Sequence, residues 1–284
     1  MKRTIIIILS LLSVLLAGCS KSDVSEAGDG EVTVTYSVSA PSTKAFGKGE
    51  SVNKVWYALY RTDGTLVKNY APVPFENGSA NCPVEMMRGH SYKVAFVVQH
   101  YSDAGVPTYE IDAHNASLVM PVEAVANSDD YDVFTYVDPV DNYQGQPADA
   151  VVLTRKVAQV NFIASDWDEA EALGKLPACS SVVFSKISRS YGILTDTPSA
   201  ETVSVNYAKS AVPGEASVLG TVFCFVGGGE GFATPAVLRL YDSLDPSAVP
   251  TRIVEVPALI MKTNFKTNVT CAIMTGNTSS QTLN

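Results

Sequence analysis

The chain has 284 residues, with 29 acidic and 20 basic side chains and a formal net charge of −9 at pH 7. That length suits one large or two medium domains with a buried core. A surface this acidic would repel phosphate groups, which argues against a nucleic-acid partner, and acidity by itself indicates no enzyme class.

A short apolar segment opens the chain. Lys2 and Arg3 precede an apolar run that ends in Leu16-Ala17-Gly18-Cys19. The run is shorter than the roughly 20 apolar residues that a transmembrane helix needs. This order resembles the signal of a bacterial lipoprotein, in which the chain is cut before the cysteine and the cysteine then carries the lipid. We therefore expect residues 1–18 to be a signal peptide and Cys19 to be lipidated; the alternative is an ordinary secretory peptide that ends near a cysteine.

The next segment, residues 19–30, is small, polar and acidic. It cannot bury enough apolar surface to fold alone, so we interpret it as a tether. An acidic stretch after a lipidated cysteine also resembles the surface-export signals of Bacteroidota lipoproteins, which implies a surface-exposed place on the cell outer membrane.

Strand patterns dominate the first half of the remaining chain. An alternation of apolar and polar residues predicts a half-buried strand whose inward side chains are Val32, Val34, Tyr36 and Val38. The turn signal Asp63-Gly64 predicts a hairpin. Further strands are predicted over 55–60, 65–67, 92–99, 131–137 and 151–154.

The second half repeats this character. Acidic residues after Ser165 and a stop at Gly174 predict one short helix with Ser165 as its N-cap. Strands are predicted over 157–163, 181–184, 202–207, 219–226, 236–241, 252–256 and 268–274. The polar tail, 275–284, is expected to fray. Strands at roughly ten-residue spacing with few helices favour β-sandwiches.

A loose segment, Gly145-Gln146-Pro147, precedes the most plausible domain boundary. We expect an N-terminal β-sandwich over 31–154 and a C-terminal β-sandwich over 155–284, each of ordinary domain size. The predicted fold class is therefore all-β, with two sandwiches in tandem and few short helices.

No residues have the spacing of a catalytic or metal site. Surface or loop positions are expected for the histidines, which are His90, His100 and His114. A solvated loop rather than a calcium site is expected for the aspartates Asp129, Asp130, Asp132, Asp138 and Asp141. The later cysteines lack C-x-x-C spacing, and Cys224 and Cys271 are expected to be small buried residues. We predict no enzyme activity, no metal and no cofactor.

Four short patterns occur in order along the chain. The first two are the lipidation pattern ending at Cys19 and the early strand followed by Ser42-Thr43-Lys44-Ala45-Phe46. The third is Arg155-Lys156-Val157-Ala158-Gln159-Val160, and the fourth is Phe265-Lys266-Thr267-Asn268. Together they resemble the fimbrillin-like lipoproteins of Bacteroidota, which are subunits and accessory proteins of pili.

The resemblance implies two transthyretin-like β-sandwiches and assembly by β-strand donation, with other fimbrial subunits as partners and adhesion as the role. It implies that a protease removes the first strand after a basic residue and that a strand of another subunit fills the vacated groove. Lys44 and Ala45 match the cut site, where pilins of this type often carry arginine. The donated side chains would be Val32, Val34, Tyr36 and Val38.

Other interpretations stay open. The first strand is permanent if the protein is an uncleaved anchor or tip protein that keeps its lipid on Cys19. A lipid-anchored glycan-binding protein of an uptake system would also fit two sandwiches and a tether. That function predicts an exposed aromatic platform, whereas Trp56, within a predicted strand, is expected to be a core residue and Trp167 is expected to pack against a sheet. A glycosidase on this fold would need a spaced pair of acids, and no spacing singles one out.

Overall fold

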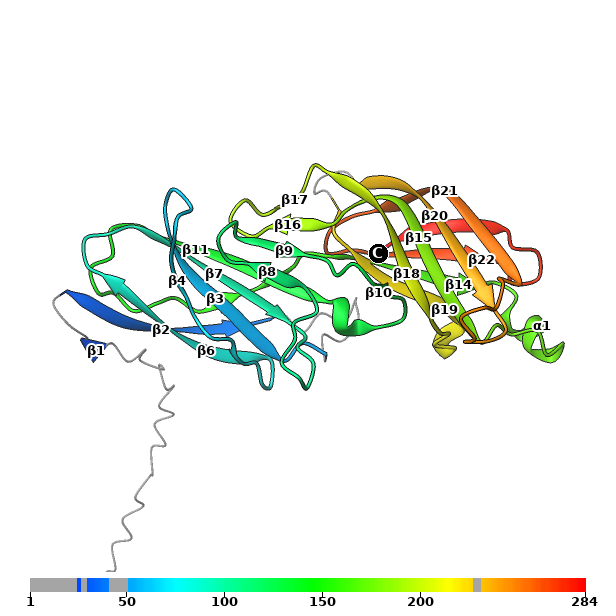
Figure 1. Cartoon of the computed structure of the whole chain (residues 1–284), viewed down its shortest axis with the longest axis horizontal. Helices are drawn as coiled ribbons and strands as arrows, with labels where there is room; N and C mark the ends of the chain where they lie inside the picture. The colour runs from blue at the N-terminus through cyan, green and yellow to red at the C-terminus, as the bar shows by residue number, and fades with distance from the viewer. Residues whose placement is uncertain (1–24, 27–29, 41–50, 227–230) are drawn as a thin grey trace, which may run out of the picture.

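The computed structural model describes residues 25–26, 30–40, 51–226 and 231–284, and Figure 1 shows two bodies of β-sheet placed end to end. The fold is all-β, as the strand patterns predict. The described residues hold one short α-helix, α1 (Trp167–Ala172), and two 3-10 turns, η1 (Asp129–Tyr131) and η2 (Glu215–Ser217). Two pairs of facing sheets make two β-sandwiches, and a small sheet lies between them (Figure 1).

The first sandwich contains the first long strand, β2 (Glu31–Ser39). In its sheet, β2 pairs with β6 (Ser79–Met87) along one edge and with β1 (Ser25–Glu26) and β12 (Val151–Val152) along the other. The facing sheet has the order β13 (Thr154–Arg155), β11 (Val133–Val140), β7 (Tyr92–Gln99), β3 (Lys54–Arg61) and β4 (Leu66–Asn69), with β5 (Val73–Pro74) also on β3. Both sheets contribute to one buried cluster.

Strands β3 and β7 are buried on both faces, which explains why their sequences are continuously apolar. Tyr57 and Phe96 face the core of the first sandwich. Trp56, Ala58 and Val97, at alternate positions, belong instead to the second buried cluster, which extends into the C-terminal half. The sheet of β3 and β7 is therefore shared between two cores. The expectation that Trp56 is a core residue is confirmed.

The second sandwich follows after residue 157. One sheet has the order β10 (Ala124–Val125), β18 (Thr202–Ala211), β15 (Cys179–Ser188), β20 (Phe232–Tyr241) and β21 (Arg252–Met261). The other has the order β19 (Val218–Cys224), β14 (Ala158–Ala164), β22 (Lys266–Cys271) and β23 (Thr278–Leu283). Strand β10 comes from the first half of the chain and pairs in parallel with β18, so the halves share a sheet.

A small four-stranded sheet joins the halves (Figure 1). It consists of β8 (Glu110–Asp112), β9 (Ser117–Val119), β16 (Ser190–Gly192) and β17 (Thr197–Pro198). Tyr191 pairs with Leu118 across the middle of this sheet, and both side chains are buried. The sequence did not reveal these strands, because each is only two or three residues long.

Two adjacent basic residues form ion pairs at the point where the chain passes from the first sandwich to the second. Arg155 Nε and Nη2 donate to the two carboxylate oxygens of Asp132 at 2.7 and 2.8 Å, and both side chains are buried. Lys156 Nζ lies 2.6 Å from Asp196, next to β17. Asp132 was expected in a solvated loop, and that expectation is wrong. The predicted boundary between 154 and 155 stays a prediction; β13 pairs with β11 of the first sandwich, and β14 lies in the second.

Two local expectations in the second half are wrong. The N-cap of α1 is Asp166 rather than Ser165. The Asp166 carboxylate accepts hydrogen bonds from the backbone N–H groups of Ile273 and Met274, and the Ser165 hydroxyl donates to the Cys271 carbonyl. The tail does not fray, because β23 pairs antiparallel with β22. Backbone pairing orders this polar segment although it buries little apolar surface.

The four cysteines of the described residues are all buried and unbridged: Cys82, Cys179, Cys224 and Cys271. Burial raises the pKa of the Cys82, Cys224 and Cys271 thiols to about 12. The expectation that Cys224 and Cys271 are small core residues is confirmed.

Candidate functional site: the first strand and its groove

Strand β2 lies in a groove of the first sandwich and is bonded along both edges. It pairs with β6 in antiparallel register from Glu31 opposite Met87 to Ser39 opposite Ser79. On its other edge, β1 pairs only near Val32 and Thr33, and β12 only near the C-terminal end of β2. A gap in strand pairing is therefore left beside the middle of β2, next to residues 34–37.

The inward side chains of β2 complete the core of the first sandwich. Val32, Val34, Tyr36 and Val38 are at most 1% exposed, whereas the alternate residues are half-buried or exposed. The Tyr36 ring packs against Phe96 of the facing sheet, with 5.1 Å between ring centroids. The predicted strand and its buried face are present in the structure; donation of this strand stays a prediction.

The sequence did not reveal β6, the main partner of β2. Its buried residues alternate regularly as Ala80, Cys82, Val84 and Met86, which is the period of a half-buried strand. Pro83 lies in the middle and lowers the strand signal. A proline fits here because β6 pairs only with β2 and is the edge of its sheet.

A polar contact anchors the middle of β2. The Tyr36 hydroxyl donates to Asp138 Oδ2 at 3.0 Å. Both residues line a hollow of about 140 Å³ beside the unpaired edge of β2, together with Asp149. The buried Tyr143 hydroxyl, on the same lining, has no hydrogen-bond partner in the described part of the chain. Asp138, expected in a solvated loop, is instead half-buried against β2.

We expect Asp138→Asn to stabilise the protein at neutral pH. Burial raises the pKa of Asp138, the Tyr36 hydrogen bond opposes that rise, and nearby Asp149 adds to it. The pKa of Asp138 is thus higher in the folded protein than in the unfolded chain. The protonated carboxyl therefore stabilises the folded protein below the pKa of the unfolded chain, and this stabilisation is lost as the pH rises through the pKa of the folded protein. The amide avoids this loss, and its oxygen still accepts the Tyr36 hydrogen bond.

Thermal melts should therefore show a higher midpoint for Asp138→Asn than for the parent at pH 7, with the difference shrinking as pH falls toward about 4. Asp141→Asn, on an exposed neighbour, is the matched control and should leave the midpoint nearly unchanged at both pH values. The same gain at both pH values would contradict the assignment of the effect to Asp138 ionisation.

The remaining predicted site residues lie outside the described residues. These are the lipidation residue Cys19 and the processing residues Lys44 and Ala45. Strand β2 ends at Ser39, and the next described strand, β3, begins at Lys54. Within the described residues, contacts to β2 from later in the chain are all non-covalent.

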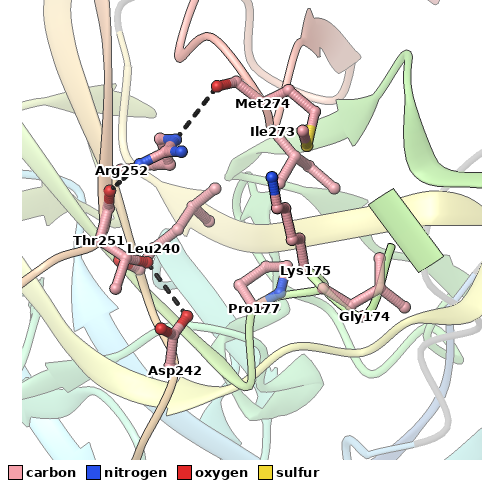
Figure 2. A pocket seen from close by; sticks show the side chains of 10 residues that line it. Gly174, Lys175, Pro177, Leu240, Asp242, Thr251, Arg252, Ile273 and Met274 are labelled. Atoms are coloured by element: carbon pink, nitrogen blue, oxygen red, sulfur yellow. Dashed lines mark hydrogen bonds between the residues drawn. The ribbon is translucent and has the colours of Figure 1, made fainter. Parts of the chain in front are cut away.

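A second hollow lies in the C-terminal sandwich and measures about 570 Å³. Figure 2 shows Arg252 bonded to the carbonyl oxygens of Thr251 and Met274, and Thr251 bonded to Asp242. Leu240 and Ile273 contribute buried apolar surface to the lining. The charged residues of this hollow are exposed to solvent. Arg252 and Asp242 already form hydrogen bonds within the protein, as Figure 2 shows. The geometry of the hollow therefore selects no ligand.

The described residues form neither a metal site nor an exposed aromatic platform. Within residues 25–26, 30–40, 51–226 and 231–284, no group of three or more His, Cys, Asp or Glu side chains could hold a metal ion. Tyr136 is the one exposed aromatic residue in the part of the chain that the structure describes, so no aromatic platform is formed there. No helix of the described residues is long and apolar enough to cross a membrane.

The sequence matches the model of a protein family of unknown function, DUF6562, over residues 25–282. None of the curated proteins compared with the chain matches it.

Several solved structures have the same fold. A candidate cell adhesion protein from Bacteroides uniformis is 13% identical, with a TM-score of 0.53 over 90% of this chain and 99% of that one. A candidate polysaccharide-binding protein from Bacteroides thetaiotaomicron is 12% identical, with a TM-score of 0.52 over 84% and 92%. A candidate adhesin from the same organism is 7% identical, with a TM-score of 0.51 over 88% and 95%. At these identities the likeness shows the fold alone.

Proposed function

We propose that this chain, which belongs to the DUF6562 family of unknown function, is a surface adhesion protein that takes part in a pilus assembled by β-strand donation. Proteins of the same fold are described as a candidate adhesin and a candidate cell adhesion protein, which supports the adhesion role. The architecture of β2 supports the assembly mechanism. The protein would be lipid-anchored through Cys19 on the outer membrane and would have other fimbrial subunits as partners.

The observation that carries the proposal is the position of β2 at the start of the described fold. Its four inward side chains complete a core, yet β2 precedes every other long strand of the described residues. A cut after Lys44 would leave β2 held only by hydrogen bonds and side-chain packing. After that cut β2 would no longer be joined through the backbone to β3 and the later strands, so it could leave the groove.

A replacement strand would have to match the vacated groove. The groove selects apolar side chains at alternate positions, because it is lined by Ala80, Cys82, Val84 and Met86. The C-terminal strand β23 reads Thr-Ser-Ser-Gln-Thr-Leu and lacks that alternation. We therefore expect the replacement strand to come from a different subunit rather than from β23 of another copy of this chain, which favours a terminal or accessory position in the pilus.

Surface shearing of the native host tests the proposal. We expect the protein in the sheared fraction to begin at Ala45 and to run as a ladder of multimers when it is not boiled, because donated strands resist detergent. Lys44→Ala should abolish both the new N-terminus and the ladder. Lys48→Ala, four residues further on, is the matched control and should preserve both.

Two results would contradict the proposal. A ladder that persists in Lys44→Ala would show that this bond does not control assembly. A single lipidated species in the parent strain, without multimers and retained on a glycan column, would favour the glycan-binding protein of an uptake system.

A further inference from the structure

A hollow of about 430 Å³ lies on the outer face of the sheet formed by β19, β14, β22 and β23. Three side chains form a row across its floor, because Thr221 pairs with Asn161 and Asn161 pairs with Asn268 in the strand register. Their sequence neighbours Val160 and Val269 point into the core. One wall comes from the first half of the chain, at Asn127 and Asp129, and the other from residues 213–218.

The floor carries an unsatisfied hydrogen-bonding group. Asn268 Oδ1 is buried and has no partner in the described part of the chain. Asn161 Oδ1 accepts from Thr221 Oγ1 at 3.1 Å and from Gln159 Nε2 at 3.0 Å, while its Nδ2 group finds no partner within the described ranges. A buried polar atom without a hydrogen-bond partner destabilises the folded state. This pair of amides therefore offers an acceptor and a donor side by side.

The side chain of Asn127, in the wall of the hollow, forms hydrogen bonds through both its oxygen and its nitrogen, unlike the side chains of Asn161 and Asn268 in the floor. Its Nδ2 donates to Ser180, Ser210 and the Ala211 carbonyl, and its Oδ1 accepts from the Thr221 N–H at 2.7 Å. Every polar atom of the Asn127 side chain is therefore bonded within the protein, and these bonds hold the wall in place. The opposite wall holds Ala216 in left-handed backbone, with φ 51°, which is a strained conformation for a residue with a side chain.

We propose that this hollow binds a neutral saccharide. Sugar hydroxyls both donate and accept, so one sugar ring can accept from the Asn161 amide group and donate to the Asn268 oxygen once a half-turn of the Asn268 amide brings that buried oxygen into the hollow. The rim carries two carboxylates, on Asp129 and Glu215, against one ammonium group, on Lys266, which disfavours an anionic ligand. The volume falls within the ~300–1,000 Å³ typical of small-molecule pockets. An extended peptide would need a free strand edge, whereas this hollow lies on a sheet face.

The inference does not rest on strand donation and would hold for an anchored, uncleaved protein. It is tested with the full-length chain in detergent and a panel of free glucose, galactose, mannose, N-acetylglucosamine and their disaccharides. Saturation-transfer NMR identifies the sugar that binds, and calorimetry measures its affinity.

Asn268→Val is the decisive variant, because removing a buried amide oxygen that has no partner separates binding from stability. We expect the affinity to fall on the order of tenfold or more while the urea midpoint stays equal or rises. Asn161→Asp keeps the oxygen that serves Thr221 and Gln159 but loses the donor, and it should weaken binding similarly. Asn206→Val, at an exposed strand position of the other sandwich sheet, is the matched control and should leave binding unchanged.

Three results would overturn the proposal. The first is that no sugar of the panel binds the parent chain. The second is that Asn268→Val binds as well as the parent. The third is that Asn268→Val lowers the urea midpoint, which would assign Asn268 a structural role.

Discussion

A chain that begins at Ala45 is expected to leave its first sandwich unfolded when it is alone and to fold it when a peptide of residues 31–40 is added. The truncation removes four side chains that are at most 1% exposed, Val32, Val34, Tyr36 and Val38. Burying four such side chains stabilises by roughly 6–12 kcal/mol. The whole stability of a domain is only about 5–15 kcal/mol, so the first sandwich should not survive their loss.

Hydrogen exchange of the β6 and β7 amides measures this effect, because both strands lose protection when the core opens. The control is a peptide in which Val34 and Tyr36 are both changed to Asp, which keeps the length and should not restore protection. Full protection of β6 in the truncated chain without any peptide would contradict the prediction and would make β2 dispensable.

Arg155→Met is expected to destabilise the protein by roughly 3–5 kcal/mol, because it leaves the Asp132 carboxylate buried without its charged partner. Burial raises the pKa of Asp132, and the two guanidinium hydrogen bonds oppose that rise. The Arg155 guanidinium also lies 4.9 Å from the centre of the Phe134 ring, so the packing of β11 is affected as well. Urea unfolding followed by circular dichroism measures the loss.

Two further variants distinguish the buried ion pair from a general effect of charge removal. Lys68→Met breaks a largely exposed pair with Glu85 and should cost less than about 1 kcal/mol. The double variant Arg155→Met with Asp132→Leu removes both buried charges and should recover most of the loss. A single Arg155→Met variant no less stable than Lys68→Met would contradict the role of the pair.

The sequence could predict the parts of the fold whose signal is local. The alternation from Val32 to Val38 and the apolar runs of β3 and β7 are written in adjacent residues, so these strands were found. Asp132 was misjudged because its partner, Arg155, lies 23 residues away, and nothing near Asp132 marks it as buried. Strand β23 was missed because backbone pairing with β22 orders it, not burial of its own side chains.

Of the two candidate sites, one has a local signal in the sequence and the other does not. The buried face of β2 follows from period-two alternation. The amide row does not, because Asn161 and Asn268 occupy the outward positions of their strands, where polar residues are ordinary. The role proposed for them depends on the register of two strands and on the wall supplied by Asn127. No pattern in a single stretch of sequence contains that information.

The pairing of β2 with β6 also determines how the protein would respond to mechanical load. Figure 1 shows β2 running along the long axis of the molecule. Once β1 has peeled away from β2, a pull along this axis on the residues before Glu31 would shear the ladder of β2 against β6, from Glu31–Met87 to Ser39–Ser79, all at once. Strands loaded in shear must break many hydrogen bonds together, whereas strands that are peeled apart break them singly. The first sandwich is thus oriented to resist tension that arrives from its N-terminal side.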